Sequence, residues 1–498
     1  MLKVKHIIKS ILDLWAKLNP NTRIYLVIGV LCGAFIGIGY RFIEDEYYAY
    51  AFIPLVLLGI LFLKYRFSKG LYIIAFLTPF SINFTFKELE FTLSLPAEPI
   101  LILMMLMFLW TMLMEGGYNK SIIRHPVTIT IFINLFWMLI CSVFSTDPLV
   151  SFKFILARLW FVVPCFFIAL ALFTSLNRIR TFLFCYLLSL FAVIVYSTIN
   201  FLISGFELQN AHFVMQPFYN DHTAYGAIVA LMFPVTLYFS FGKGVCNKWL
   251  RLFFILMSVS LLLALILSYA RAAWLSVIVA FAVYIIVRLN IRFTTFAVSA
   301  VLLGLLLFLG WQPLMQQLEK NAQDSSGNIL EHITSMSNIS TDASNVERLN
   351  RWSCALRMWK ESPITGFGPG TYQFQYASYQ KSYQKTWIST DFGTLGNAHS
   401  EYLGPLSEMG VLGTLSVMLI FGMTMYCGFS TYRRMKKNKE GKLALWLTIS
   451  LITYYVHGFM NNFLDTDKLS VPFWAFTAAI VSLNILSKKK LKTLKKMA

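Results

Sequence analysis

Long apolar runs recur along almost the whole chain, and short polar connections separate them. A helix needs about 17–25 mostly apolar residues to cross about 30 Å of hydrocarbon, and we count about fourteen runs of this length. They lie near residues 24–41, 46–63, 70–86, 97–114, 127–144, 152–174, 180–203, 223–241, 250–268, 272–288, 294–311, 402–428, 443–460 and 470–487. The pattern predicts an all-α polytopic membrane protein with about fourteen transmembrane helices.

The connections between these runs alternate in charge. One set is rich in lysine and arginine, whereas the opposite set is acidic or nearly uncharged. The basic set comprises residues 3–9, 64–69, 120–124, 178–180, 243–248, 288–292, 433–442 and 488–496, and the other set includes 44–46, 88–90, 147, 204–222 and 465–467. Because basic loops stay on the cytoplasmic side, we expect both termini to lie in the cytoplasm.

Composition agrees with this class and limits the chemistry. Hydrophobic residues make up 57% and charged residues 13% of the chain, which excludes an ordinary soluble core. The net charge of +19 follows from the basic loops, so we expect no nucleic-acid partner. The basic, amphipathic start predicts no cleavable signal peptide. The sequence contains no CxxC or HExxH pair, so we expect neither a bound metal nor another cofactor.

One connection is much longer than the others and divides the chain into three parts. Helices are expected over 1–311, a large external loop over 312–400, and the last helices with a basic cytoplasmic tail over 401–498. Loops of this length are usually functional or disordered. A capping box at 344–347 predicts an amphipathic helix over 345–361, which ends before Pro363.

The predicted helix over 345–361 has two different faces. We expect its apolar stripe to consist of Leu349, Trp352, Leu356 and Trp359. Arg348 and Arg351 are three residues apart and project from another side, which predicts two exposed cations at the membrane surface. This helix could then close as a lid over an anionic substrate.

Two further arginines lie where a positive charge is costly or unexpected. Arg158 lies within the run 152–174, and an arginine inside hydrocarbon costs about 2.5–3.5 kcal/mol on insertion scales. Arg271 lies in a tight connection on the acidic side of the membrane. Both positions predict binding of an anion. The alternatives are that Arg158 extends to the interface and that Arg271 contacts a lipid headgroup.

A histidine lies at the boundary between the large loop and the next apolar run. His399 has an ordinary pKa of about 6.5, so it can accept a proton from a hydroxyl group at neutral pH. Glu401 could orient the imidazole or accept the proton itself. If His399 is the base, the reaction rate should fall below about pH 6. The alternative is a packed or solvated histidine without a catalytic role.

Other polar segments on the same side are less specific. Asn220 and His222 could contact acceptor sugars, or they could belong to the cap of the run that starts at 223. The glycines of 366–370 favour a tight turn that directs Tyr372 toward the membrane over a phosphate-binding loop. Two carboxylates at 465–467 are a weak indication of a divalent metal.

Four blocks in this order resemble the O-antigen ligase and polymerase superfamily of bacterial envelopes. They are residues 268–274 (SYARAAW), 347–352 (ERLNRW), 363–370 (PITGFGPG) and 398–410 (AHSEYLGPLSEMG). The resemblance covers roughly residues 215–425. It implies a glycosyltransferase fold of the C type that moves a glycan from undecaprenyl pyrophosphate to an acceptor on the periplasmic side, without a metal.

The resemblance also implies roles for individual residues. Arg271, with Tyr269 beside it, and Arg158 would bind the pyrophosphate, and His399 would activate the acceptor. Attack from the opposite face of the donor sugar would invert its anomeric centre. The protein would then reside in the bacterial inner membrane with its active site facing the periplasm.

Three interpretations follow from these observations. The first is a ligase that joins the glycan to lipid A-core or another acceptor, with an O-antigen or exopolysaccharide polymerase as its closest alternative. The second is a polysaccharide flippase or transporter, which needs polar groups along a central path rather than at one face. The third is a non-catalytic assembly protein, which should tolerate substitution of Arg271 and His399.

Overall fold

The computed structural model describes residues 69–86, 91–206, 210–290, 343–382 and 396–497, with 19, 22, 67, 385 and 389 as isolated positions. The described residues from 69 onward belong to one compact unit. The runs predicted near 24–41, 46–63 and 294–311, and the first part of the large loop, lie outside the described residues.

Nine helices in the described part of the chain are long and apolar enough to cross a membrane. They are α4 (Ala97–Glu115), α6 (Pro126–Val143), α7 (Pro148–Val162) with its continuation to Leu172, α9 (Leu176–Ile203), α10 (His222–Phe241), α11 (Lys248–Leu267), α12 (Arg271–Arg288), α18 (Leu403–Arg434) and the first part of α20 (Asp467–Met497). Helix α19 (Lys439–His457) is of similar length, but its first turn is charged. This confirms the predicted all-α polytopic membrane protein.

The transmembrane helix predicted near 70–86 is wrong in its second half. Its helix ends at Phe80, and a two-stranded antiparallel hairpin follows, formed by β1 (Ile82–Phe86) and β2 (Phe91–Leu95). Ile82 pairs with Leu95, so the strands are in full register. Polar and apolar residues alternate along both strands, and this period of two overrides the overall apolar character.

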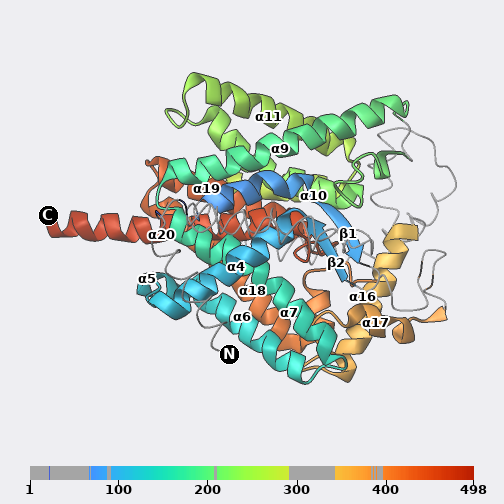
Figure 1. Cartoon of the computed structure of the whole chain (residues 1–498). Coiled ribbons are helices and arrows are strands. Elements are labelled where there is room, and N and C mark those ends of the chain that lie inside the picture. Colours follow the sequence, from blue (N-terminus) through green and yellow to red (C-terminus); the bar gives the residue numbers. More distant parts are fainter. Residues whose placement is uncertain are drawn as a thin grey trace, which may run out of the picture. The chain divides into compact units, whose positions relative to one another are not determined.

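Helices α10 and α20 are the most buried of the nine. Figure 1 shows them with α19 in the middle of the helices, between α9 and α11 on one side and α6, α7 and α18 on the other. Helix α10 contacts α11, α12 and α19. Gly226 allows the close approach of α10 to the start of α12, because a Cβ there would lie 2.5 Å from Ala270 Cβ.

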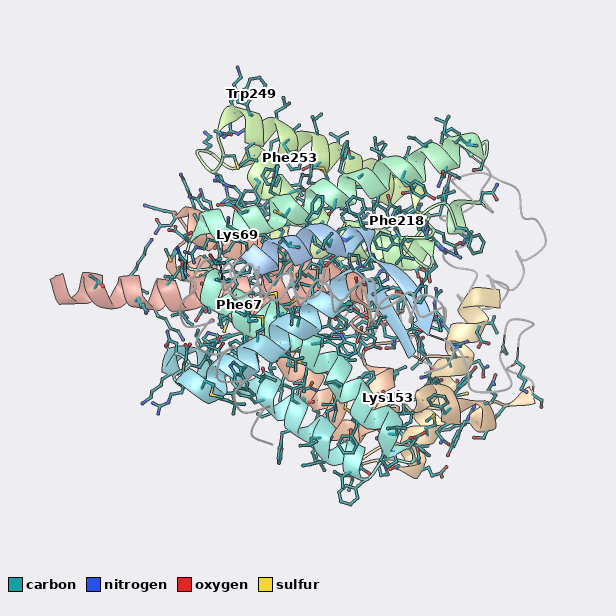
Figure 2. The ribbon with its side chains drawn as sticks, viewed as in Figure 1. Phe67, Lys69, Lys153, Phe218, Trp249 and Phe253 are labelled. Carbon is teal, nitrogen blue, oxygen red and sulfur yellow. The ribbon has the colours of Figure 1, made fainter. Side chains whose placement is uncertain are left out.

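The connections gather at two opposite ends, as the alternating charge predicts. At the basic end Arg180 donates to the carbonyl of Val245 (3.0 Å), and Lys436 donates to Asn290 Oδ1 (3.0 Å). The hairpin, α16 (Ala343–Glu361) and α17 (Tyr372–Gln375) lie at the other end, away from the C-terminus of α20 (Figure 1). Figure 2 shows Lys69 toward the basic end and Phe218 toward the hairpin. We call this second end the α16 end.

Helix α18 is interrupted at Gly410, near the α16 end. Gly410 has φ 65°, and the carbonyl of Pro363 accepts a hydrogen bond from the next backbone N–H at 3.0 Å. A Cβ on Gly410 would lie 2.0 Å from the carbonyl oxygen of Ile364, and one on Gly366 would lie 2.2 Å from the carbonyl carbon of Glu408. The glycine turn and the start of α18 therefore pack backbone against backbone.

Candidate functional site

Residues 396–401 connect the large loop to α18 and are held from two sides. From α16, the Arg351 guanidinium donates to the carbonyl of Asn397 (3.1 Å). From the connection after α19, the carbonyl of Gly458 accepts a hydrogen bond from the Glu401 N–H (2.7 Å). Between these anchors His399 adopts a positive φ of 47°, a conformation that is uncommon for non-glycine residues.

The predicted exposure of Arg351 is wrong. Only 6% of this residue is exposed, and its guanidinium forms an ion pair with Glu347 one turn earlier (2.8 Å). The expected apolar stripe does not form the buried face either, because Leu349 and Leu356 are 42% and 41% exposed. The helix instead buries a polar pair that fixes the 396–401 segment, an arrangement that helical periodicity alone does not reveal.

Tyr372 also differs from its predicted direction. The glycine turn at 366–370 is present, but Tyr372 is buried and its hydroxyl donates to the carbonyl of Arg351 (2.8 Å). Its backbone N–H donates to Glu408 Oε1 (3.0 Å). Tyr372 therefore points at α16, and together with Glu408 it fixes the position of that helix relative to α18.

Glu401 is buried on the side opposite α16. Its Oε1 accepts hydrogen bonds from the Tyr454 hydroxyl (2.5 Å) and from the backbone N–H groups of Phe463 and Leu464 (both 3.0 Å). Burial raises the pKa of this carboxyl, and the nearby Asp465 raises it further. These bonds orient the connection between α19 and α20, and the expectation that Glu401 orients the imidazole of His399 stays a prediction.

The electrostatic surroundings of His399 keep its imidazole neutral. Burial lowers its pKa from 6.5 to about 3, and the positive charges of Arg351 and Arg348 act in the same direction. Asp221 opposes them. An imidazole with this pKa stays unprotonated well below pH 6, which argues against the rate loss expected below that pH. A neutral imidazole can still accept a hydrogen bond or a proton from a hydroxyl group.

Arg348 and Asp221 are common neighbours of three histidines. The electrostatic partners of His222, His399 and His457 include both residues. The structure thus brings together the starts of α10 and α16, the 396–401 segment and the end of α19. We call the set Asp221, His222, Arg271, Arg348 and His399 the arginine–histidine cluster.

Arg271 joins this cluster as the first residue of α12. It is half-buried, and its charge acts on His222. The preceding Tyr269 has φ 49°, and its ring contacts Phe201 and Trp274 with centroid separations of 6.3 and 6.5 Å. The tight connection between α11 and α12 therefore presents a guanidinium at a helix N-terminus, where the backbone itself favours anions.

The segment before α10 contains the predicted cap, whereas contact of Asn220 and His222 with acceptor sugars stays a prediction. Asp221 caps the helix, because its Oδ1 accepts from the N–H groups of Thr223 and Ala224 (both 2.8 Å). His222 faces His212, with their Nδ1 atoms 2.9 Å apart. Asn220 accepts a hydrogen bond from Asn83 in the hairpin (3.3 Å), which links the two segments at the α16 end.

Arg158 lies apart from the arginine–histidine cluster in its contacts. It donates to the carbonyl of Leu464 (3.0 Å) and forms an ion pair with Asp465 (2.8 Å), and its charge acts on Glu401 and Glu408. The expectation that Arg158 and Arg271 bind one pyrophosphate together stays a prediction. Asp465 pairs with Arg158, whereas Asp467 accepts a hydrogen bond from the Ser81 hydroxyl, so the two carboxylates of 465–467 have different partners.

Several residues at these sites were not predicted to be functional. They are His212, Tyr454, His457, Asn461 and Asn462. His457 accepts or donates a hydrogen bond with Asn461 (3.2 Å), and Tyr454 binds Glu401. Tyr454 and His457 are three residues apart on α19, so they share one face of that helix, and this spacing at the end of an apolar run could have indicated them.

Comparison with known proteins addresses the family. Residues 252–418 match the family model described as O-antigen ligase. No curated protein matches the chain. The matched region includes Arg271, Arg348 and His399, whereas Arg158 and His222 lie outside it. The resemblance inferred from the four sequence blocks is thus confirmed, and the chain contains a domain of the O-antigen ligase superfamily over residues 252–418.

Proposed function

We propose that this protein is a membrane glycosyltransferase that moves a glycan from undecaprenyl pyrophosphate to lipid A-core on the periplasmic face. The observation that supports this most is the arginine–histidine cluster, in which the charge of Arg348 acts on both His222 and a neutral His399, and that of Arg271 acts on His222. A lipid-linked donor has its diphosphate at the membrane surface, and the charge pattern of the connections would place the start of α12 at that surface.

The arginines would bind the donor diphosphate and stabilise it as it leaves. Cleavage of the bond between the sugar C1 and the phosphate oxygen leaves the electron pair on the diphosphate. Guanidinium groups can hold two oxygens at once, and their fixed position stabilises the charge that develops. Arg351 cannot share this role directly, because its guanidinium is engaged by Glu347 and Asn397; it positions the 396–401 segment instead.

His399 would take the proton from the acceptor hydroxyl as its oxygen bonds to C1. A pKa of about 3 makes the imidazole a weak base in the free protein. A bound diphosphate would offset the positive charges of Arg348 and Arg351, which would raise that pKa. The base would therefore become stronger when the donor is bound. Attack on the face opposite the diphosphate would invert the anomeric centre.

A polymerase would use the same donor site and differ in its acceptor, a second lipid-linked glycan. A flippase requires a polar path through the helices. The two most buried spans argue against this, because α10 has an uncharged interior and the charged residues at the start of α20 are buried at the α16 end.

The test is transfer by the purified protein in lipid nanodiscs. Undecaprenyl-pyrophosphate-linked glycan is supplied with either lipid A-core or more of the same lipid-linked glycan. Product on lipid A-core is the expected result, and elongated lipid-linked glycan would identify a polymerase. Absence of transfer to both acceptors, with lipid A-core confirmed as competent in a parallel native membrane extract, would overturn the proposed function.

A further inference from the structure

A cavity of about 420 Å³ is lined by part of the 396–401 segment and by no residue of the arginine–histidine cluster. This volume lies within the roughly 300–1,000 Å³ of small-molecule binding sites. Residues from α6, α7, α18 and α20 form its walls, together with parts of 370–373, 396–401 and 462–465. The cavity extends from the α16 end down between the spans.

The charged groups of the cavity do not suit an anion. Its lining contains the carboxyl groups of Glu401, Glu408 and Asp465 and the single guanidinium of Arg158. Arg158 is already paired with Asp465. A diphosphate would therefore meet no excess of positive charge here. Carboxyl groups and amides do accept hydrogen bonds from hydroxyl groups, which are the recurring polar groups of an uncharged sugar.

Two polar atoms of the lining lack partners within the described residues. They are Asn462 Oδ1, an acceptor, and Trp474 Nε1, a donor, and both atoms are buried. Burying such a group without a hydrogen bond costs about 1–3 kcal/mol. The indole of Trp474 also supplies an aromatic wall beside Phe473, with ring centroids 5.2 Å apart. An acceptor, a donor and an aromatic surface together match the mixed faces of a pyranose ring.

The cavity and the proposed base share one wall. Ala398 and Ser400 line the cavity, whereas His399 between them faces Arg348 and Arg351. The positive φ of His399 permits this reversal of direction. Because a glycan is a chain of rings, a sugar next to the reacting one can occupy a space beside the reaction site.

We propose that this cavity is a carbohydrate subsite that binds an uncharged sugar ring of the donor glycan or of the acceptor. The proposal rests on the proposed function and assigns a substrate class to a place that the diphosphate site does not use. It predicts that blocking the cavity weakens glycan binding while diphosphate binding at the arginines is preserved.

Gly404 offers a way to block the cavity without disturbing the fold. It lines the cavity on the first turn of α18, and a Cβ there would meet only Ala398 Cβ, at 3.8 Å. A Gly404→Leu side chain would extend into the free space. Gly422, on the same helix, has nothing within 4 Å of a Cβ and lies outside the cavity lining. Gly422→Leu is therefore the matched control.

The experiment measures binding and transfer separately. The glycan released from the donor by mild acid and the oligosaccharide released from lipid A-core are each tested for binding by saturation-transfer NMR and as competitors of transfer. We expect Gly404→Leu to weaken binding of one of them at least about tenfold, corresponding to the loss of one or two hydrogen bonds. Glycan-free undecaprenyl pyrophosphate should bind as in the wild type, and Gly422→Leu should match the wild type throughout.

The identity of the affected oligosaccharide distinguishes the two sources of the sugar. Weakened binding of the released donor glycan places the donor in the cavity, and weakened binding of the core oligosaccharide places the acceptor there. Equal binding of both by the wild type and Gly404→Leu, or no binding by either protein, overturns the subsite. A wild-type protein that binds sugar in this cavity but transfers nothing to any acceptor would instead overturn the proposed function.

Discussion

At the scale of single residues, the environment of His399 decides what it can do. The side chain is half-buried at a strained backbone position, next to two arginines. Such strain costs about 1–3 kcal/mol and persists only where the surroundings fix it. Arg351 and Glu401 supply that fixation from opposite sides. The strain is consistent with selection for position rather than for stability.

The pH dependence follows from the lowered pKa of His399. The unprotonated imidazole is the active form, so kcat/KM for the donor should not lose activity through this group between about pH 7 and pH 5, because its pKa is about 3. In kcat the acid loss should begin at a higher pH, because the bound diphosphate raises the pKa. Steady-state kinetics measured across this pH range give the acid dependence of kcat/KM and of kcat separately. An acid limb near pH 6.5 in kcat/KM would show an unperturbed imidazole.

The same shift affects stability. In the unfolded state His399 has a pKa of about 6.5, so it is protonated below that pH. In the folded state its pKa is about 3, so it stays unprotonated down to about pH 3. The unfolded state therefore binds more protons in this window, and the free energy of unfolding decreases as the pH falls through it. The His399→Gln variant should lose this part of the pH dependence of the thermal midpoint.

Replacing His399 separates catalysis from donor binding. His399→Ala should lower the transfer rate by about 10²–10⁴-fold, the usual contribution of general acid–base catalysis. Binding of undecaprenyl pyrophosphate should change little, because Arg271 and Arg348 hold the diphosphate. Single-turnover transfer and equilibrium binding in nanodiscs are the two measurements. Equal loss of both would make His399 a diphosphate ligand.

Arg271 is predicted to act through its charge and its planar shape. Arg271→Ala should abolish transfer while the protein still inserts and folds, because the residue is only half-buried. Arg271→Lys should restore part of the activity, since an ammonium group cannot hold two oxygens in the same fork. Donor binding and thermal stability are compared for both variants. Full transfer by the alanine variant would remove Arg271 from the site.

The sequence predicted some of these residues and missed others for physical reasons. Arg271 stood out because a positive charge is unexpected on the acidic side of the membrane, and His399 because a titratable group closes the large loop just before an apolar run. Arg158 was also predicted to bind an anion because of its position within an apolar run. Its partner Asp465 lies 307 residues away, and no local sequence pattern predicts such a pair. Tyr454 and Asn462 were missed because polar residues at helix ends usually only cap.

At the scale of elements, the contact between the glycine turn at 366–370 and α18 leaves no space for an added side chain. Gly410→Ala would require a side chain at φ 65° and a Cβ 2.0 Å from a backbone oxygen. We expect a loss of at least about 1–2 kcal/mol, the usual cost of a left-handed conformation, and a displaced Glu408 that no longer holds Tyr372. Thermal unfolding and transfer are measured.

Gly422→Ala serves as the control for that substitution. It lies on the same helix, and a Cβ there would have nothing within 4 Å. Alanine favours helix by about 1 kcal/mol over glycine, so this variant should be as stable as the wild type or slightly more so. If Gly410→Ala behaves in the same way as Gly422→Ala, the backbone packing does not determine the geometry of the site.

Helices could be predicted where the sequence was apolar throughout. They could not be predicted where an alternation of polar and apolar residues, typical of strands, extended an apolar run. The runs that became α4, α6, α10 and α11 have uniform hydropathy and were placed within a few residues. The hairpin was missed because its strands extend an apolar run. The span after Pro148 contains a π-helical segment, Val163–Ile168, where Pro164 lacks an N–H and the carbonyl of Phe167 accepts from Tyr118 (2.7 Å).

At the scale of the whole molecule, the family match and the fold cover different parts. The matched region, 252–418, contains the arginine–histidine cluster except for its α10 contribution. The cavity needs α6, α7 and α20, which lie outside that region. The helices before residue 252 and after 418 therefore complete both sites around the matched domain. For this reason the four sequence blocks, which lie inside the matched region, indicated the proposed chemistry. The helices outside that region could be predicted only as apolar runs.

The orientation of the molecule in the membrane is the last prediction. Positively charged connections gather at one end and the proposed site lies at the other, so the positive-inside rule places the site in the periplasm. A cysteine at Ser378, which is exposed at the α16 end, should react with a membrane-impermeant maleimide added to intact spheroplasts. A cysteine at Lys437, exposed at the basic end, should react only after the membrane is permeabilised.

The unsubstituted protein gives the background from its own cysteines, of which Cys354 is buried. Labelling of Lys437→Cys but not Ser378→Cys from outside would invert the topology. The arginines would then face the cytoplasm, where a periplasmic glycan donor could not reach them.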